Sequence, residues 1–305
     1  MQDKVSGTAL LWAIMRGLRP AQWTKNAVVF AALIFALGDA TQQVDWRVSG
    51  LRVLFAAMAF CLLSSAVYLL NDVRDREQDR QHPLKRLRPI AAGLLPVPIA
   101  FGVAIGLVVI ASVMALFLGG YLPHVLLAYL IIQIAYSCGL KRVALVDVFV
   151  IAGGFVLRAL AGAVAIEVEI SPWLLLCTML LALFLGLCKR RHEKVVLSDA
   201  ANQTRASMQA YNEQLLDQLI AIVSAATVVC YALYTLWPDT VEKFGTTRLG
   251  FTIPFVLFGL FRYLDLVYRH ERGGRPEHIL LTDVPLIIDL MLYGATVAIV
   301  LIAGN

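Results

Sequence analysis

The sequence predicts an all-α polytopic membrane protein with about nine transmembrane helices. Of its 305 residues, 60% are hydrophobic and only 15% are charged, whereas soluble domains carry about 25% charged residues. Apolar runs recur along the whole chain at lengths near the ~20 residues that cross a bilayer as a helix. We therefore expect one transmembrane domain over residues 1–305.

Nine apolar runs account for the predicted helices. The first is the shortest, because Lys25-Asn26 precede it and Gly38-Asp39 follow it. Ahead of it, residues 8–19 are apolar on one side, so an amphipathic helix on the membrane surface is expected there. The runs lie at about residues 27–37 with their flanks, 53–70, 97–118, 122–140, 143–166, 173–188, 215–237, 251–268 and 284–302.

Basic residues fall on alternate connections between these runs. The connections at 119–122 and 167–172 contain no Lys or Arg, and 237–250 contains only Lys243 and Arg248. The positive-inside rule then places the N-terminus and the basic connections in the cytoplasm, in a multi-pass protein of the plasma membrane. The basic connections carry Arg74, Arg76, Arg80, Lys85, Arg86, Arg88, Lys141, Arg142, Lys189, Arg190, Arg191, Lys194, Arg205, Arg269, Arg272 and Arg275.

Several function classes find no support in the sequence. The five cysteines lie in or beside apolar runs without a Cys-x-x-Cys or Cys/His cluster, so neither a disulfide framework nor a cysteine metal site is expected. No Walker loop or Rossmann glycine pattern occurs, and Gly153-Gly154 within the fifth run indicates close helix packing. We expect no nucleic-acid partner.

The run from Asn71 to Arg80 carries the strongest chemical signal. Asp72, Asp75 and Asp79 follow an apolar run at spacing i, i+3, i+7, so on a continuous helix they share one face at the membrane boundary. Carboxylates that close repel one another unless a cation lies between them, and hard oxygen ligands favour Mg²⁺ together with substrate phosphates. We predict a Mg²⁺-diphosphate site with these aspartates as catalytic residues and Asn71 as a neutral ligand. The alternative is a solvated helix end of mixed charge.

The segment after this motif adds cations at the same place. Arg80, Lys85 and Arg88 lie on a loop whose shape Pro83 and Pro89 restrict. They are candidates to bind the anionic oxygens of a metal-bound substrate. Their alternative role is to set topology and contact lipid headgroups.

These two segments resemble the signature motifs of the UbiA superfamily of membrane prenyltransferases. Asn71, Asp72, Asp75 and Asp79 match its NDxxDxxxD motif, and residues 79–93 match the DRxHPxKRxRPIAxG run that follows. The resemblance implies a UbiA-like bundle of about nine helices with a cytoplasmic-facing active-site cavity and Mg²⁺ as cofactor.

A departure from the superfamily pattern narrows the expected substrate. Ordinary prenyltransferases of the superfamily carry a second acidic DxxxD motif after the sixth helix. Here that segment reads Lys189-Arg190-Arg191-His192-Glu193-Lys194, and Asp199 stands alone. A basic cluster opposite a Mg²⁺ site suits a substrate with a further phosphate that no metal covers.

A phosphoribosyl-transferring branch of the superfamily meets that description. The chain resembles it at residues 18–26, at Leu140-Lys141-Arg142 with Asp147, at residues 153–158 and at residues 189–193. The donor implied is phosphoribosyl pyrophosphate, and the acceptor implied is a polyprenyl phosphate, decaprenyl phosphate. The product implied is a precursor for cell-wall arabinan.

Further charged and polar residues are candidates for this site. Arg158 lies about midway along the fifth run, where a lone cation is expensive, so we expect it to face the cavity with an anionic partner. Tyr136 is a candidate hydroxyl donor or an interface anchor. Asp289, in the last run, has no partner that the sequence identifies. The candidates for the phosphates that Mg²⁺ does not cover are Lys25, Lys141, Lys189, Arg190 and Arg191, each of which could instead only set topology.

The predicted reaction is transfer of 5-phosphoribosyl to the lipid phosphate with release of diphosphate. One alternative is prenyl transfer from a prenyl diphosphate to an aromatic acceptor. Another is a transporter or flippase that uses Asp265, Asp289 and Arg158, but it predicts an inverted hydropathy repeat, which the chain does not show. A homo-oligomer is compatible with every one of these.

Overall fold

Helices make up nearly all of the computed structural model, which describes residues 7–39, 44–83, 85–169, 171–204, 206–270, 273–274 and 276–304 and has no strand within them. Arg205, Arg272 and Arg275, used above for topology, lie outside these residues. The long helices are α3 (Trp46–Arg74), α5 (Val97–Leu118), α6 (Leu122–Cys138), α7 (Val146–Ala165), α8 (Pro172–Thr204), α10 (Glu213–Leu236), α12 (Ile253–Tyr268) and α14 (Val284–Gly304). The shorter ones are α1 (Gly7–Leu18), the 3₁₀ helix η1 (Pro20–Phe30), α2 (Ala31–Leu37), α4 (Arg76–Gln81), η2 (Lys85–Leu87), η3 (Leu140–Arg142), α9 (Ala206–Ala210), α11 (Pro238–Phe244), η4 (Arg248–Thr252) and α13 (Pro276–Thr282).

Seven of the described helical segments are long and apolar enough to cross a membrane. They are α3, α5, α7, residues Pro172–Val195 of α8, α10, η4 together with α12, and Val284–Leu301 of α14. The prediction of an all-helical, multi-span protein is confirmed. The predicted count of nine is not reached by helices of this length in the described chain: residues 122–140 contain the 17-residue α6, and residues 27–37 fall on η1 and α2.

Small residues let these helices approach closely. The buried face of α5 consists of alanines four and seven residues apart, and α5 packs against α3. Such a stripe permits close van der Waals contact, which drives helix association in lipid. The buried alanines are Ala100, Ala104, Ala111 and Ala115. Large apolar residues of α5 that stay exposed, as lipid contact requires, are Ile99, Phe101, Ile105, Val109, Ile110, Val113, Leu116 and Phe117.

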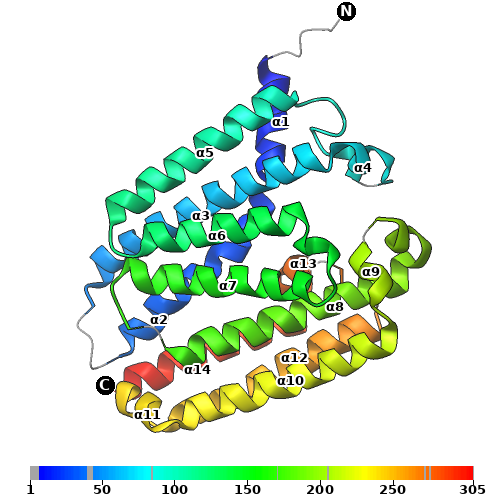
Figure 1. Ribbon diagram of the computed structural model, residues 1–305. Helices are drawn as coiled ribbons and strands as arrows, with labels where there is room; N and C mark the ends of the chain where they lie inside the picture. The colour runs from blue at the N-terminus through cyan, green and yellow to red at the C-terminus, as the bar shows by residue number, and fades with distance from the viewer. Residues whose placement is uncertain are drawn as a thin grey trace, which may run out of the picture.

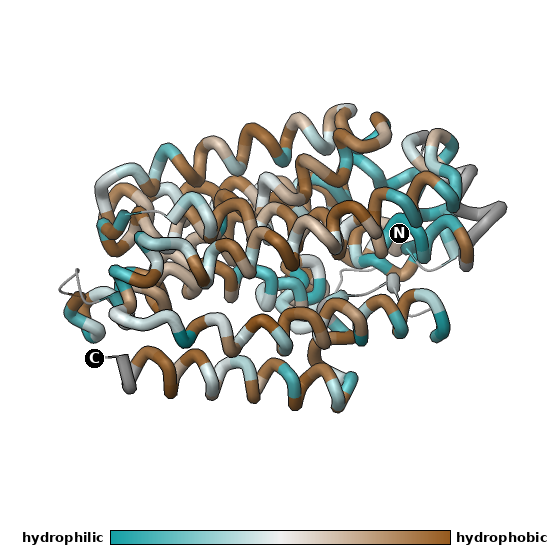
Figure 2. Tube along the Cα trace, turned by 90° about the horizontal axis from the view of Figure 1, so that it is seen from below, coloured by the Kyte–Doolittle hydropathy of each residue, from teal (hydrophilic) through white to brown (hydrophobic). Residues whose placement is uncertain are grey.

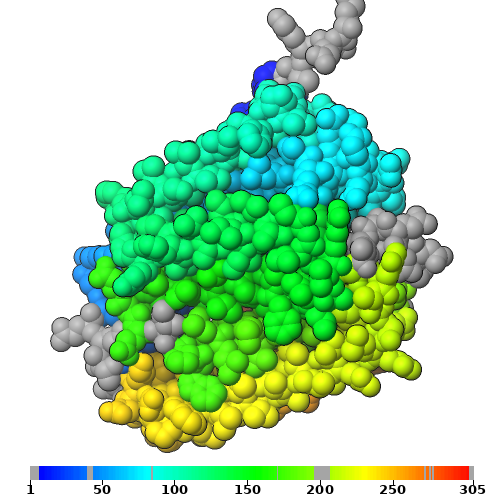
Figure 3. Space-filling view, viewed as in Figure 1, coloured from blue at the N-terminus to red at the C-terminus, as the bar shows by residue number. Residues whose placement is uncertain are grey.

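α7 connects two apolar cores. Its residues Ala161 and Ala165 belong to the core shared with α3, α5 and α6, whereas Val148 and Ala152 belong to the core shared with α8, α10 and α12. Figure 1 shows α7 between α6 and α8. On the face seen in Figure 3, α5 lies above α3 and α4, and below them the colours run from green to yellow in chain order.

Polar residues gather at the ends of the helices, most densely at the end near the N-terminus (Figure 2). The chain places α4 at this end, directly after α3 (Figure 1). The acidic motif, at the junction of the two helices, therefore lies where the apolar part of the bundle ends.

α1 coincides with the predicted amphipathic segment at residues 8–19. Ala13 and Gly17 are buried, and α1 packs against α3, while Leu11, Trp12 and Met15 stay exposed. The helix ends at Leu18, and the next residue, Arg19, has a φ of 54°, the left-handed conformation that turns the chain into η1. Its position on a membrane surface stays a prediction.

The closest approach of two described segments at a glycine lies between η1 and α7. A Cβ on Gly162 would lie 1.9 Å from the carbonyl oxygen of Val29. Because a backbone atom cannot swing aside, we expect Gly162→Ala to lower the free energy of unfolding by about 1–3 kcal/mol. Gly153→Ala is the matched control on the same helix, since a Cβ there meets nothing within 4 Å. Thermal unfolding in detergent would test this, and equal stability of the two variants would contradict the close contact.

Candidate active site

The acidic motif occupies a break between two helices. α3 ends at Arg74 and α4 begins at Arg76, with Asp75 between them at φ −87° and ψ 6°. The helix is therefore not continuous through the motif. Backbone bonds from Asp75 N to Asn71 O (2.9 Å) and from Asp79 N to Asp75 O (2.8 Å) nevertheless keep helical spacing across the break.

Arginine and lysine side chains from three distant segments hold the three carboxylates. Asp72 is 2% exposed and accepts hydrogen bonds from Arg19 Nη2 (2.5 and 2.7 Å) and from Arg88 Nη1 (3.0 Å). The same Arg88 nitrogen donates to Asp79 at 2.7 Å. Asp75 instead accepts from Lys141 Nζ at 2.7 Å. Asp72 and Asp79 thus face one point, and Asp75 faces another.

The donor set fits Mg²⁺ through two carboxylates. In the described part of the chain, no group of three or more His, Cys, Asp or Glu side chains is placed to hold a metal ion. Mg²⁺ is usually bound by one or two carboxylates plus substrate phosphates and water, so it does not need such a group. Asp72 and Asp79, which converge on one cationic nitrogen, meet that requirement. Asp75 and Asn71 lie toward Lys141 instead, with Nζ 3.5 Å from Asn71 Oδ1.

Burial changes the acidity of side chains at this site. Burial raises the pKa of Asp79, while Arg88 acts in the opposite direction and the neighbouring Asp72 adds to the rise. Burial and the nearby Lys85 lower the pKa of His82. The carboxylates are therefore partly removed from water. In this less polar environment their interactions with cations are stronger than at an exposed surface.

η1, which contains most of the N-terminal signature at residues 18–26, packs against α3 and α7. A 3₁₀ helix has three residues per turn, so Trp23, Asn26 and Val29 lie on one face. Trp23 donates to Ser65 Oγ at 3.0 Å, Asn26 Oδ1 accepts from Arg158 at 2.7 Å, and Val29 meets Gly162. This face fixes η1, while Lys25 stays half-buried on another face.

Arg19 is a site residue that sequence reasoning did not single out. It bonds Asp72, and its guanidinium lies 5.1 Å from the ring centre of Tyr68. The available signal was its place in the N-terminal signature at residues 18–26. It contacts a residue 53 positions away, and no periodic pattern in the sequence reveals a contact between residues so far apart.

The loop candidates lie at the same end but differ in their contacts. Arg80 is exposed and donates to the Ala91 carbonyl at 3.1 Å and to Glu77 at 3.2 Å, so it braces its own loop. Lys85 is half-buried beside His82, with its backbone N–H 3.3 Å from His82 Nδ1. Tyr136, also half-buried, lies close enough to Arg190 to interact electrostatically.

Arg158 is buried, but the prediction that it has an anionic partner is wrong for the described residues. Its guanidinium donates to Asn26 Oδ1 (2.7 Å), the Tyr129 hydroxyl (2.8 Å) and the Gly154 carbonyl (2.9 Å). The rings of Tyr129 and Phe155 lie 4.9 and 5.2 Å from its centre. Among the described residues its contacts are thus neutral oxygens and aromatic rings, which solvate the cation and tie α6, α7 and η1 together.

The basic cluster of α8 is largely engaged within the protein. Arg190, 2% exposed, pairs with Asp147 (2.8 Å) and Glu193 (2.6 Å). Arg191 pairs with Asp217 at 2.7 Å and lies over the Tyr268 ring at 3.9 Å. Both arginines are therefore neutralised by carboxylates, and Lys189 is half-buried beside them. Asp199, expected to stand alone, lies where side chains fall outside the described residues.

The fold and this site define a multi-span, all-helical membrane protein with a charged, partly buried acidic motif at one end. Comparison with known proteins identifies the family. The chain belongs to the UbiA prenyltransferase family, whose model matches residues 27–277. This confirms the resemblance drawn from the motifs.

Named relatives and solved structures extend this identification. The chain is 34% identical to a decaprenyl-phosphate phosphoribosyltransferase of Mycolicibacterium smegmatis, over 90% of this chain and 87% of the relative. It is 35% identical to the protein of that name from Mycobacterium tuberculosis, over 94% of both. The fold is similar to a UbiA homolog from Archaeoglobus fulgidus solved with GPP and Mg²⁺, with a TM-score of 0.71, 20% identity and coverage of 95% of this chain and 99% of the other.

Proposed function

We propose that the protein transfers 5-phosphoribosyl from phosphoribosyl pyrophosphate to decaprenyl phosphate or a similar polyprenyl phosphate, with release of diphosphate, as a step toward cell-wall arabinan. The relatives named above, similar along nearly their whole length, support this assignment.

The observation that carries the proposal is the meeting of Arg19 and Lys141 with the acidic motif. Both residues come from the segments that resemble the phosphoribosyl-transferring branch. In the fold they contact Asp72 and Asp75, respectively. These cations, with Arg88, are well suited to bind a substrate that carries several phosphate groups, because charge-assisted hydrogen bonds to phosphate are strong and directional.

Asp72 and Asp79 would hold Mg²⁺, with Asp75 and Asn71 at the edge of its site, and the ion would neutralise the diphosphate leaving group. Arg19 and Arg88 bind these carboxylates and can turn their remaining N–H groups toward diphosphate oxygens. Lys141, which is 12% exposed in its side chain, can do the same from the Asp75 side. Lys25 and Lys189, both half-buried, are the candidates for the 5-phosphate.

The reaction needs little proton transfer. A lipid phosphate oxygen forms a bond to the anomeric carbon, the bond from that carbon to diphosphate breaks, and diphosphate leaves with the electron pair. Because the attacking oxygen is already anionic, no strong general base is required. Positioning of the two substrates and stabilisation of the departing charge then supply most of the rate.

The orientation belongs to the same proposal. Basic residues at the α4 end of the bundle, among them Arg74, Arg86 and Arg142, favour the cytoplasmic side of the plasma membrane under the positive-inside rule. Phosphoribosyl pyrophosphate, a soluble and highly charged donor, would reach the site from the cytoplasm. The lipid acceptor would reach it from the bilayer.

The purified protein in detergent is expected to convert phosphoribosyl pyrophosphate and decaprenyl phosphate into lipid-linked phosphoribose in the presence of Mg²⁺. Chelation with EDTA should stop turnover, and added Mg²⁺ should restore it, because the diphosphate would otherwise lack neutralisation. Product can be followed by thin-layer chromatography of radiolabelled donor. Consumption of a prenyl diphosphate with an aromatic acceptor, without use of phosphoribosyl pyrophosphate, would instead select prenyl transfer.

A further inference from the structure

A carboxylate lies buried in the second half of the bundle, away from the acidic motif. Asp289 of α14 is 6% exposed, and it makes no hydrogen bond or ion pair to any residue within the described ranges. Its Oδ2 lies 3.1 Å from the point that a Cβ on Gly259 would occupy, so it fits against the bare backbone of α12. An ionisable group placed this way in a membrane helix usually marks a binding site.

Asp289 lines a cavity, called here the inner cavity, of about 350 Å³ between α8, α10, α12 and α14. Most of its wall is apolar or aromatic. Tyr293 lies one turn from Asp289 on α14. The Tyr231 hydroxyl forms hydrogen bonds with the Tyr293 hydroxyl (3.2 Å) and the Thr252 hydroxyl (2.6 Å). Aromatic rings around a carboxylate attract organic cations through ring faces as well as through charge.

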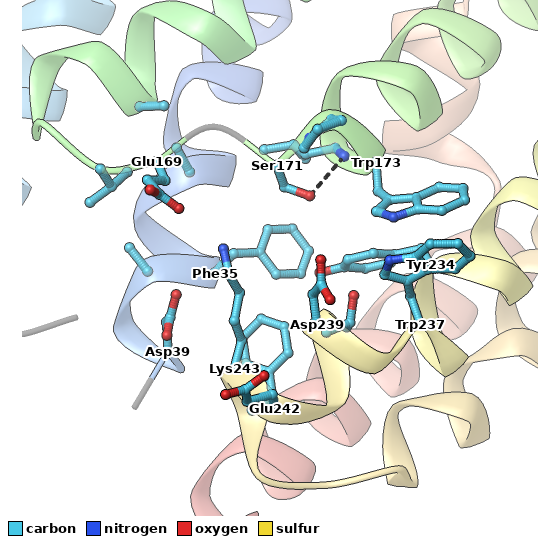
Figure 4. A pocket seen from close by; sticks show the side chains of 18 residues that line it. Phe35, Asp39, Glu169, Ser171, Trp173, Tyr234, Trp237, Asp239, Glu242 and Lys243 are labelled. Carbon is cyan, nitrogen blue, oxygen red and sulfur yellow. Dashed lines mark hydrogen bonds between the residues drawn. The ribbon is translucent and has the colours of Figure 1, made fainter. Parts of the chain in front are cut away.

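A larger cavity of about 650 Å³, called here the end cavity, adjoins the inner one. The two share the walls Phe35, Trp173, Leu174 and Tyr234. Figure 4 shows Trp173 over Trp237, whose ring centres are 5.2 Å apart. The end cavity is lined by the carboxylates Asp39, Glu169, Asp239 and Glu242 and by the ammonium group of Lys243.

This excess of negative charge favours cations. In Figure 4, Asp239 and Lys243 reach into the space opposite Glu169 and Ser171. A cavity lined mostly by one sign of charge concentrates ions of the other sign. A cation in the end cavity would lie against the aromatic residues that this cavity shares with the inner one, and the Asp289 carboxylate lines the inner cavity.

The end cavity lies at the end of the bundle opposite the proposed catalytic site. Arg52, near the start of α3, pairs with Glu167 at 2.6 Å, and Glu169 and Trp173 follow Glu167 closely in the chain. Asp72 lies twenty residues further along α3, which is about 30 Å on a straight helix. The end cavity and the acidic motif are therefore separate sites.

We propose that the end and inner cavities form a binding site for a small organic monocation, an amine or quaternary ammonium with an apolar body. The described residues bring together no cluster of His, Cys, Asp and Glu fit for a metal ion, and the wall around Asp289 is mainly apolar. An organic cation satisfies both the carboxylate and the aromatic surface. The inner cavity has the size of a small-ligand pocket.

Benzyltrimethylammonium is a suitable probe, added to the full-length protein in detergent and followed by calorimetry and by tryptophan fluorescence, to which Trp173 and Trp237 at the cavities contribute. Saturable binding is expected. Asp289→Asn should weaken it about tenfold or more, roughly 1.4 kcal/mol. Asparagine keeps the shape and removes a buried charge, so the variant should fold. Glu77→Gln, an exposed carboxylate on α4, is the matched control and should leave the affinity unchanged.

A second probe separates charge from shape. The uncharged tert-butyl isostere should bind about tenfold more weakly than the ammonium compound. Three results would each overturn the proposal: no saturable binding, equal affinity of wild type and Asp289→Asn, or equal binding of the isostere.

Discussion

Asp72→Asn is expected to lower the turnover of phosphoribosyl pyrophosphate by about 10²–10³-fold, the usual effect of losing one preorganised electrostatic group. The substitution removes a carboxylate that anchors both Arg19 and Arg88 and that would bind Mg²⁺. Asp79→Asn should cost about as much, because Asp79 shares Arg88. Asp75→Asn should cost less, about tenfold, because Asp75 faces Lys141 instead. Steady-state kinetics in detergent measures all three.

Glu77→Gln is the control, since Glu77 is an exposed carboxylate of the same segment. Stability should change little in Asp72→Asn: the side chains of Arg19 and Arg88 are each 26% exposed and can be hydrated. An Asp75→Asn variant slower than Asp72→Asn would contradict the division of the motif into a metal-facing pair and a lysine-facing carboxylate.

Asp147→Asn is expected to destabilise the protein by about 3 kcal/mol, because it removes the fully buried one of the two carboxylates that pair with the buried Arg190 guanidinium. The Asp147 side chain is fully buried and that of Arg190 is 2% exposed. Asp147 also accepts a hydrogen bond from the Tyr211 hydroxyl at 2.8 Å. Burial raises the pKa of Tyr211, so the phenol keeps its proton and donates it in this bond. The Leu145 N–H in turn donates to Tyr211 at 2.7 Å. Chemical unfolding in detergent would measure the loss.

The exposed pair Arg52–Glu167 gives the matched comparison, and Glu167→Gln should cost less than about 1 kcal/mol. Replacing both buried partners, with Asp147→Leu and Arg190→Met, should restore part of the stability, because the buried guanidinium is gone and Glu193, the other partner of Arg190, is 21% exposed and can be hydrated. A double variant less stable than Asp147→Asn would show that most of the lost stability comes from the ion pair itself and not from the guanidinium left without its Asp147 partner.

Much of the fold could be predicted because the bilayer imposes it. A helix must present about 20 apolar residues to cross, and α3, α5 and α10 display such runs plainly. α6 was placed correctly at 122–140 but is shorter than expected. The form of residues 20–30 was missed, because α- and 3₁₀-helical periodicities differ little over so few residues and tertiary contacts decided between them.

The candidate site could be predicted only where its residues are close in sequence. The spacing of Asp72, Asp75 and Asp79 placed them at one end of a helix, but the break at Asp75 and the division of the motif depend on Arg88 and Lys141. The basic run after the sixth apolar segment was interpreted as phosphate-binding. Asp147 and Asp217, 43 and 26 residues away, neutralise two of its arginines.

The 3₁₀ form of η1 bears on how the chain uses the thickness of a membrane. A 3₁₀ helix rises about 2.0 Å per residue against about 1.5 Å in an α-helix, and runs longer than about four residues are uncommon. Pro20–Leu37 therefore reaches about 32 Å, close to the ~30 Å hydrocarbon layer, where an α-helix of the same residues would reach only about 27 Å. Because part of it is a 3₁₀ helix, Pro20–Leu37, whose apolar run is short, is about as long as the hydrocarbon layer is thick.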